Sequence, residues 1–388
     1  MRIAVIGAGI GGLVAAAGLQ ADGHNVTVFE QRHEPSADGA GLTLFGNAFE
    51  ALDLLGLGDA VRAVSSGAIA SMRAGQRTPS GSWLVTVPPG AVASMRSLHR
   101  VELHRVLTER LRAGTVHAGS AALVAADGTP RVTVGDRAED FDLVVAADGI
   151  RSRNRIALGL DIGLHHSGYT AWRGVTNRAV DLHGEASETW GRGQIFGIVP
   201  LPGDRVYWFG TLNTAAGTDF PDEHEEVSRR FAGWHDPIQE CIAATAPEAV
   251  LRHDIYDLAK PLDSFVRGRT VLLGDAAHAM TPNLGQGAGQ GIEDAASLTL
   301  LLRDAGAGGL HSVLARYSDM RRRRTGTILR RSREVGRLAQ ASGPVAVALR
   351  NTALRLTPGG LMGALSRRTR SWPKHGGTPR AFSETSAR

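Results

Sequence analysis

The sequence predicts an α/β protein in which a parallel-sheet domain is interrupted by a mainly antiparallel β-sheet domain and followed by helices. A β-α-β pattern occupies the start of the chain, alternating aromatic segments fill residues 167–211, and a buried strand at 270–273 runs into a second Gly-rich turn. Strands that finish in Gly or Asp-Gly therefore stand on both sides of the β-rich section, as expected for an inserted domain. The length of 388 residues suits two or three domains.

The first elements form one compact unit. Residues 2–6 (RIAVI) read as a short buried strand, residues 13–22 as a helix of small residues, and residues 25–30 (NVTVFE) as a second strand. A β-α-β unit of this length implies two parallel strands joined by a right-handed crossover.

The later elements follow from their hydrophobic patterns. Apolar residues recur with helical spacing over 100–112, and residues 141–147 form a buried strand that ends in Asp148-Gly149. The alternation in residues 195–199 and 205–211 predicts antiparallel strands, and a helix is expected from about 289 to 303. We place the parallel-sheet domain at 1–72, 94–162 and 263–318, the inserted domain at 73–93 and 163–262, a helical region at 319–372, and a disordered tail at 373–388.

Composition excludes several classes of protein. Apolar residues make up 43% of the chain, but no apolar run reaches the roughly 18 residues that a bilayer-spanning helix needs. The start of the chain lacks the basic and apolar regions of a signal peptide, so we expect a cytoplasmic protein with no membrane partner. Cys241 is the only cysteine, which excludes an internal disulfide, and no metal-binding motif is present.

The basic residues give little support for nucleic-acid binding. All but two of the 43 basic residues are arginines, and the net charge is only +5. The densest run, Arg321 to Arg324, distributes charge around several faces of a helix, which favours a solvated helix over a phosphate-binding groove. We therefore expect no nucleic-acid partner.

The turn after the first strand carries a dinucleotide-binding pattern. Gly7 permits a tight turn, Gly9 lets the backbone approach a pyrophosphate, and Gly12 allows close packing of helix and strand. The helix that follows presents free N–H groups to the phosphates. Glu30, at the end of the second strand, is placed to accept hydrogen bonds from ribose hydroxyls. This pattern alone does not distinguish FAD from NAD.

Two further motifs carry a family resemblance. Asp148-Gly149-Ile150-Arg151-Ser152, with Arg155 after it, resembles the DG motif of class A flavoprotein monooxygenases, the para-hydroxybenzoate hydroxylase type. Gly274-Asp275-Ala276-Ala277-His278, continuing through Pro282, Gly285-Gln286-Gly287 and Glu293-Asp294, resembles their GD motif and the helix behind it. The three motifs match in order and approximate spacing, and the likeness extends to about Trp372.

The resemblance implies a Rossmann-like FAD-binding domain of the GR2 type. Asp275 would accept hydrogen bonds from the ribityl chain, and the glycines between 285 and 291 would form a loop lying flat against the flavin ring. The following helix would direct its positive end at the flavin and stabilise the reduced ring. His278 is expected to be structural and not a catalytic base, and Gly289 stands where many relatives carry Asn. The expected FAD-binding residues are Gly7, Gly9, Ile10, Gly11, Gly12, Glu30, Gln31, Arg32, Gly41, Arg100, Asp148, Arg155, Gly274, Asp275, Pro282, Gly285, Gly287, Ala288 and Gly289.

The resemblance also implies an activity. NADPH or NADH would reduce FAD, O2 would form a flavin C4a-hydroperoxide, and one oxygen atom would pass to a small aromatic or heteroaromatic substrate. The single GxGxxG loop agrees with a hydride donor that binds transiently. A flavin-dependent epoxidase or oxidoreductase of the same fold stays open, as does a non-catalytic protein that binds nucleotides or nucleic acid. The chain is expected to be a monomer or a homodimer.

Substrate-binding residues are expected on the inserted sheet. The candidates are Trp172, Arg173, Phe196, Tyr207 and Trp208. Aromatic side chains would pack against a planar ring, and Arg173 would hold an anionic group. The alternative for each of them is an ordinary core position in an alternating sheet.

Overall fold

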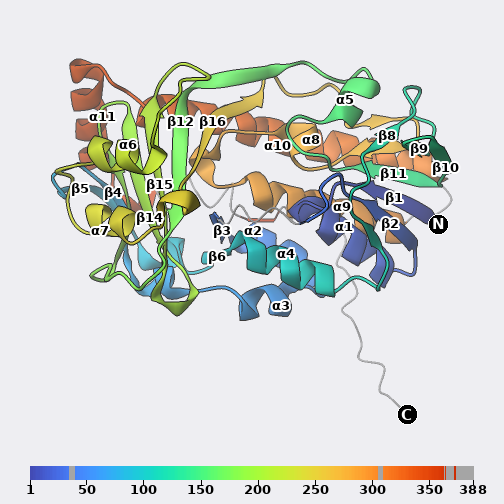
Figure 1. Cartoon of the computed structure of the whole chain (residues 1–388), viewed down its shortest axis with the longest axis horizontal. Helices are drawn as coiled ribbons and strands as arrows, with labels where there is room; N and C mark the ends of the chain where they lie inside the picture. Colours follow the sequence, from blue (N-terminus) through green and yellow to red (C-terminus); the bar gives the residue numbers. More distant parts are fainter. Residues whose placement is uncertain (35–39, 305–308, 362, 364–370, 373–388) are drawn as a thin grey trace, which may run out of the picture.

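Two large sheets lie at opposite ends of the molecule's long axis, and helices connect them (Figure 1). The computed structural model describes the chain except for residues 35–39, 305–308, 362, 364–370 and 373–388. The tail predicted at 373–388 therefore lies outside the described residues.

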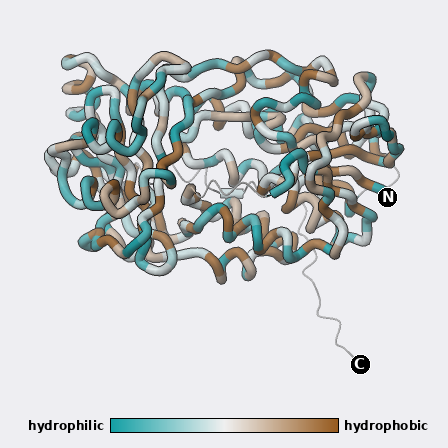
Figure 2. Tube along the Cα trace, in the orientation of Figure 1, coloured by the Kyte–Doolittle hydropathy of each residue, from teal (hydrophilic) through white to brown (hydrophobic). Residues whose placement is uncertain are grey.

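The first sheet has six strands and is parallel except at one edge. Its strands β1, β2, β7, β11 and β18 run parallel, whereas β17 pairs antiparallel with β18. Every residue of β11 is buried because both faces of the sheet are covered. Figure 2 shows many hydrophobic residues along the strands at this end of the molecule. The order is β17 (Val266–Arg267), β18 (Thr270–Leu272), β11 (Leu143–Ala146), β1 (Arg2–Ile6), β2 (Asn25–Phe29) and β7 (Val116–His117).

Helix α9 (Gly287–Arg303) packs against α1 (Ile10–Ala21), α2 (Gly46–Leu54) and α10 (Gly309–Ala339). It starts at Gly287, so the glycine-rich segment is not the flat loop that the sequence suggested. Gly289 and Gly291 lie inside the helix, where the absence of a side chain allows close packing. An ideal Cβ on Gly11 of α1 would stand 3.5 Å from the carbonyl oxygen of Gly291.

The second sheet has seven strands and is antiparallel apart from the parallel pair β13–β4. Residues far apart in the sequence meet in it, because β4 and β5 precede the other five strands by more than 70 residues. The order is β16 (Leu251–Leu258), β12 (Leu164–Val175), β15 (Val206–Asn213), β14 (Gln194–Pro200), β13 (Glu185–Trp190), β4 (Arg73–Arg77) and β5 (Trp83–Val87). The predicted α/β class with a mainly antiparallel second sheet is confirmed.

Long helix α10 links the two ends. Its 31 residues span about 46 Å. The helix packs on α9 near the parallel sheet. At its other end it reaches the seven-stranded sheet, where Gln340, the residue after the helix, donates a hydrogen bond to Thr211. Helix α11 (Pro344–Leu356) follows at the outer edge.

The smaller elements complete the two halves. The remaining helices are α3 (Gly58–Ala63), α4 (Arg100–Glu109), α5 (Arg153–Ala157), α6 (Glu223–Arg230), α7 (Ile238–Ala243) and α8 (Asp275–His278). Two small sheets comprise β3 (Gly41–Leu44) with β6 (Arg96–His99), and β8 (Ala122–Val124) with β9 (Arg131–Val134) and β10 (Arg137–Asp140). Single 3₁₀ turns are η1 (Ala68–Ser71), η2 (Pro89–Ala91), η3 (Pro202–Asp204), η4 (Pro247–Ala249) and η5 (Pro282–Leu284).

Candidate active site

The glycine-rich turn joins β1 to α1 with no room for side chains at two positions. Gly7 has a φ of 104°, a conformation that side chains disfavour. An ideal Cβ on Gly12 would stand 2.1 Å from the carbonyl oxygen of Gly7, so helix and turn are in direct contact. Gly9, in contrast, faces open space, and it caps α1 without a side-chain hydrogen bond. The first N–H groups of α1 are thus free to bind an anion.

Glu30 follows β2 and is held beside this turn. Its Oε2 accepts a hydrogen bond from the N–H of Ala8 at 2.8 Å, and its Oε1 accepts one from the N–H of Arg32 at 2.9 Å. Gln31 and Arg32 are exposed next to it, and Arg100 is exposed at the start of α4. Gln31 and Arg32 follow Glu30 at the acidic end of β2, where a ribose would meet the carboxylate.

Asp275 begins α8 at the end of the parallel sheet. Its side chain is exposed, and it has no hydrogen-bond partner among the residues that the structure describes. The preceding residue, Gly274, has a φ of 64° and donates its N–H to Asp294 Oδ2 at 2.8 Å. The backbone is therefore fixed while the Asp275 carboxylate stays available to a ligand.

Asp148 and Arg155 are engaged within the protein. Asp148 accepts hydrogen bonds from Ser152 Oγ at 2.6 Å and from Asn154 Nδ2 at 2.8 Å, which closes the turn into α5. Arg155, only 1% exposed, donates to the carbonyl oxygens of Ile150 at 2.9 Å and Ala276 at 3.1 Å. Arg155 thereby ties the DG turn to the GD turn, which is a positioning role.

The start of α9 provides a second open cradle. Gly287 faces open space, and α9 has no side-chain N-cap among the described residues. Gly285 has a φ of 62°, and an ideal Cβ there would lie 3.0 Å from the ring of Phe45. The half-buried Ala288 and the exposed Pro282 flank this opening. The N–H groups at the start of α9 thus face an open space. A flat ring can approach them there, because no side chain of Gly287 is in the way.

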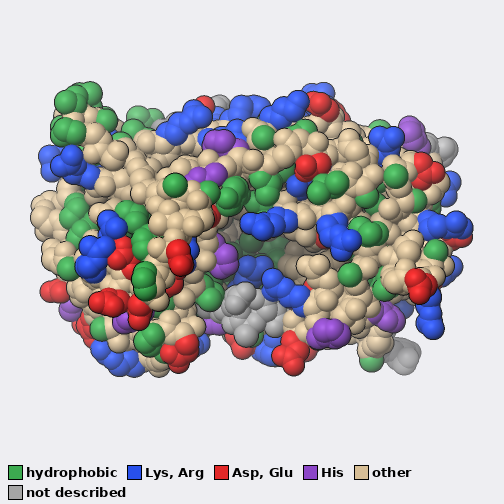
Figure 3. All heavy atoms as spheres, turned by 45° about the horizontal axis from the view of Figure 1, so that its top comes forward, with side chains coloured by type: hydrophobic (Ala, Val, Ile, Leu, Met, Phe, Trp, Pro, Cys, Tyr) green, Lys and Arg blue, Asp and Glu red, His purple; other side chains and the backbone are tan. Residues whose placement is uncertain are grey.

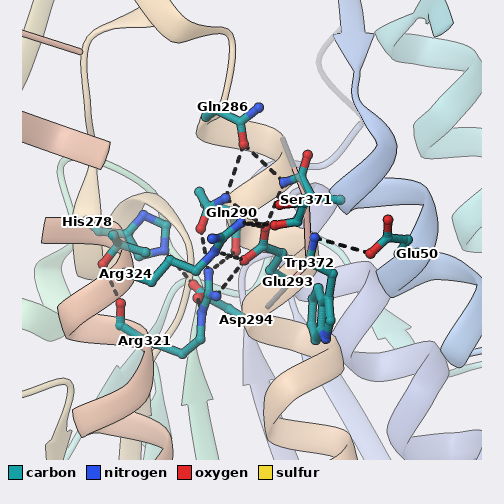
Figure 4. Close-up of polar contacts among 12 residues, drawn as sticks. Glu50, His278, Gln286, Gln290, Glu293, Asp294, Arg321, Arg324, Ser371 and Trp372 are labelled. Atoms are coloured by element: carbon teal, nitrogen blue, oxygen red, sulfur yellow. Dashed lines mark hydrogen bonds and ion pairs between the residues drawn. The ribbon is translucent and has the colours of Figure 1, made fainter. Parts of the chain in front are cut away.

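A buried charged cluster lies behind this cradle, and sequence analysis missed it (Figure 4). Arg321 of α10 donates Nε to Asp294 Oδ1 at 2.5 Å and Nη1 to Glu293 Oε2 at 2.6 Å. All three side chains are at most 1% exposed. The prediction that the Arg321–Arg324 run forms a solvated face was wrong for Arg321, because its guanidinium compensates two buried carboxylates.

The cluster extends from the charged pair to the start of α9. Arg324 donates to Glu293 at 2.5 Å, and His278 Nε2 lies 2.5 Å from Asp294 Oδ2, which agrees with the expected structural role of His278. Uncharged members continue it: Asn47 Nδ2 donates to Glu293 at 2.6 Å and to Gln286 Oε1 at 3.0 Å. Figure 4 shows Arg321, Arg324 and His278 pointing toward the carboxylates of α9.

Opposing effects set the pKa values in this cluster. Burial raises the pKa of the Asp294 carboxyl, but the charges of His278 and Arg321 outweigh it and hold that pKa below its ordinary value. The pKa of Glu293 is lowered as well, because Arg321 and Arg324 outweigh its burial. Both carboxylates are therefore charged at neutral pH.

The substrate candidates divide between the two faces of the seven-stranded sheet. Trp172, Phe196 and Trp208 are fully buried in a core with residues of α6 and α7. Trp172 Nε1 donates to Glu223 at 2.6 Å, and Trp208 Nε1 donates to Thr245 at 2.8 Å. The prediction that these three residues contact substrate was wrong, because alternation along each strand turns them away from the parallel-sheet half.

Arg173 and Tyr207 occupy the opposite face, toward the parallel-sheet half. Gly41 of β3 lies against the Tyr207 ring, where an ideal Cβ would stand 2.2 Å from Cγ. Burial raises the pKa of Tyr207, and nearby Arg173 partly offsets that effect. Tyr169 is on the same face, and its hydroxyl accepts a hydrogen bond from Asn283 Nδ2 of η5 at 3.0 Å. Sequence analysis missed Tyr169, although it lies four residues before Arg173 on the same side of β12.

The surface between the two halves is hollowed. Figure 3 shows this hollow with several Lys or Arg side chains at its rim. Turn η5 connects the two halves here, because it lies between Asp275 and the open Gly287 in the chain and its Asn283 donates a hydrogen bond to Tyr169 of β12. Such a junction can hold an extended anionic nucleotide with a planar group near the sheet.

Comparisons with known proteins agree with this geometry. Residues 1–332 match the family described as FAD binding domain. The chain is 34% identical over 382 residues to aurachin C monooxygenase/isomerase of Stigmatella aurantiaca, covering 95% of this chain and 97% of that protein. It is 35% identical over 370 residues to 2-heptyl-3-hydroxy-4(1H)-quinolone synthase of Pseudomonas aeruginosa, covering 92% and 94% of the two chains. The solved structure of a Klebsiella pneumoniae protein with FAD and uric acid is similar, with a TM-score of 0.85, 28% identity and coverage of 95% and 96%.

Proposed function

This chain belongs to the FAD binding domain family of FAD-dependent aromatic monooxygenases, and we propose that it uses NAD(P)H and O2 to insert one oxygen atom into a planar heteroaromatic small molecule. The single observation that supports this best is that the free carboxylate of Asp275 and the uncapped start of α9 stand on either side of η5 in the chain, and that Asn283 of η5 donates a hydrogen bond to Tyr169 of the seven-stranded sheet.

The residues present fit FAD. Gly9 and the start of α1 would hold the pyrophosphate, Glu30 the adenosine ribose, and Asp275 the ribityl hydroxyls. Gly287 leaves room for the flat ring. No protein atom lies within 4 Å of the position that a Cβ on Gly287 would take, so a side chain there would occupy the space that the ring needs. When bound, FAD supplies the redox chemistry, which is acceptance of a hydride from NAD(P)H and activation of O2.

The protein's own groups orient the partners and exclude water. The N–H groups at the start of α9 would stabilise negative charge at the adjacent ring edge. Gly285 and Phe45 close the cradle from the side of α2. In this assignment the parallel-sheet half binds the cofactor, and the seven-stranded sheet (with the inserted segments 73–93 and 163–262) covers the substrate.

The inner face of that sheet points to the substrate class. Tyr207 offers an aromatic surface, the Arg173 guanidinium offers a donor for an oxyanion or a ring carbonyl, and the buried Tyr169 supports this face through its hydrogen bond with Asn283. Two proteins similar to this chain bear on the choice, since one is named for a quinolone and one was solved with uric acid. We therefore assign a fused heteroaromatic ring with an oxo or hydroxyl group as the substrate.

A substrate panel under labelled oxygen tests this function. Purified protein should be yellow, and quinolones, purines and hydroxybenzoates should be screened for accelerated NADH or NADPH oxidation. The expected product gains one oxygen atom from 18O2, and its position separates ring hydroxylation from epoxidation. Product formation without O2, or a colourless protein that does not bind FAD, contradicts the assignment.

A further inference from the structure

Helix α11 is fixed to the outer edge of the seven-stranded sheet by one buried face. Arg350, 2% exposed, donates to the carbonyl oxygens of Ala339 at 2.8 Å and Gly191 at 2.9 Å. Its guanidinium also lies 5.6 Å from the centre of the Trp190 ring, and Leu354 is buried in the same cluster. The rotation of α11 about its axis is therefore set by Arg350 and Leu354.

The opposite side of α11 presents large apolar side chains to solvent. Val345, Leu349 and Leu356 are 70%, 66% and 77% exposed. Their spacing of four and seven residues places them on one side of the helix. Leu338 at the end of α10 and Leu361 after α11, 48% and 52% exposed, flank them in the sequence. We call these five residues the α11 face.

The concentration of these residues is unusual for a soluble surface. Within the described part of the chain, eight large hydrophobic residues are exposed, and five of them belong to the α11 face. Figure 3 shows a group of hydrophobic side chains at the corner of the molecule that α11 occupies in Figure 1, with basic side chains below it. A contiguous apolar patch with a polar surround marks an interaction site.

Among the described residues near the α11 face, Arg337 and Arg355 are exposed basic residues, and the exposed Glu334 of α10 is an acid that precedes them in the chain. The sequence has no Asp or Glu from residue 335 to residue 383, but it has eight basic residues there. That number exceeds the net charge of +5 for the whole chain, so the remainder of the chain is slightly acidic. Arg337 and Arg355 are exposed beside the apolar residues. The partner of this face is therefore expected to be apolar and anionic together.

We propose that the α11 face docks this protein onto an anionic lipid bilayer. An amphipathic helix with basic residues at its border lies in the plane of the membrane, with its apolar side at the level of the acyl chains. Basic residues near the surface add attraction to anionic headgroups. None of the described helices is long and apolar enough to cross a bilayer, and surface docking needs none. The absence of a spanning segment, from which the sequence predicted no membrane partner, does not bear on this mode of binding.

A second copy of the chain fits this face less well. Two copies that meet through α11 would bring two exposed arginines of each chain together, Arg337 and Arg355, against one nearby exposed acid of α10, Glu334. A stable dimer also needs about 800 Å² on each partner, which is more than one short helix face of five side chains supplies. A bilayer imposes neither requirement.

Flotation of the FAD-loaded full-length protein with vesicles tests the docking. Vesicles of phosphatidylcholine with 30% phosphatidylglycerol are compared with pure phosphatidylcholine at low salt. Wild-type protein should float with the anionic vesicles, at least tenfold more than with the neutral ones, and salt should reduce the binding because it screens the arginines. Leu349→Glu should lower binding to anionic vesicles at least tenfold, and the double variant Arg337→Gln, Arg355→Gln should lower it about tenfold.

Matched variants separate docking from loss of structure. Ile156→Glu makes the same change at an apolar side chain that is 59% exposed on α5, away from the α11 face, and should leave flotation unchanged. All variants should keep the wild-type melting temperature and FAD absorbance, since the buried anchors Arg350 and Leu354 are untouched. Equal binding of wild type and Leu349→Glu overturns the docking. A lipid-free dimer that Leu349→Glu dissociates, with no flotation of wild type, overturns it too and assigns the face to a second copy.

Discussion

Arg321 and Asp294 form a fully buried ion pair that joins α10 to α9, with 2.5 Å between Nε and Oδ1. The other oxygen of Asp294 accepts the N–H of Gly274, the residue before Asp275. A residue of α10 with no place in the family-like motifs therefore controls the turn that carries the proposed ribityl contact. The same guanidinium holds Glu293, so it also fixes the first turns of α9.

Replacing Arg321 with Met should strongly destabilise the protein. The change leaves Glu293 and Asp294 buried with less compensating charge, a situation that costs about 3–5 kcal/mol of unfolding free energy. The FAD dissociation constant should rise as well, because the turn at Gly274 loses its support. Urea denaturation and FAD fluorescence quenching measure the two effects.

Arg323→Met is the matched control for this change. Arg323 lies two residues away on α10, but its side chain is 77% exposed and, among the described residues, pairs with Asp319. Its replacement should alter stability by less than about 1 kcal/mol. Equal losses in the two variants would contradict the assignment of the burial effect to Arg321.

The buried carboxylates make stability depend on pH. The pKa values of Asp294 and Glu293 are lowered in the folded protein, so these groups stabilise it above the ordinary carboxyl range near pH 4. That contribution should be lost as pH falls through the folded pKa values, because protonation removes the ion pairs. Asp294→Asn should flatten part of this dependence when urea midpoints are compared between pH 7 and pH 3. An unchanged pH profile in Asp294→Asn would show that the acid sensitivity originates elsewhere.

Replacing Asp275 with Ala should weaken FAD binding without altering the folded protein. The Asp275 side chain is exposed and makes no hydrogen bond with the described residues, so the melting temperature of the apoprotein should not change. Loss of hydrogen bonds to a carboxylate should raise the FAD dissociation constant about ten- to hundredfold. Asp263→Ala is the control, because Asp263 is another exposed aspartate and lies three residues before β17 of the same sheet. Wild-type affinity in Asp275→Ala would refute the ribityl contact.

Local patterns sufficed to predict much of the fold. The glycine spacing, the buried strands and the alternation in β14 and β15 depend on neighbours in the sequence, and these patterns predicted the α/β class. The sequence did not predict that Gly289 and Gly291 lie inside α9, because Gly289 packs beside α2 and Gly291 beside α1, and these are contacts between distant segments.

Side-chain burial was harder to predict than secondary structure. Arg321 belongs to a run of four arginines, and only the three-dimensional packing of α10 on α9 distinguishes it from Arg323. The sequence did contain a signal for a buried cation. Glu293 and Asp294 interrupt a helix made mostly of small and apolar residues, and carboxylates buried there require positive charges beside them. For Trp172 and Trp208 the alternation was visible, but which face meets the parallel-sheet half depends on tertiary structure.

Adjacent residues of β12 should respond differently to substitution, because they lie on opposite faces of the sheet. Arg173→Gln removes a cation from the inner face, so KM for an anionic or oxo-bearing substrate should rise about ten- to hundredfold, while FAD absorbance and stability stay close to wild type. Trp172→Phe removes the buried hydrogen bond to Glu223, so it should lower the unfolding free energy by about 1–3 kcal/mol and leave KM unchanged. Steady-state kinetics on the substrate found by the panel, together with urea denaturation of both variants, measure this difference. If Trp172→Phe raises KM and Arg173→Gln does not, the substrate lies on the α6–α7 side of the sheet and the site proposed at the junction is wrong.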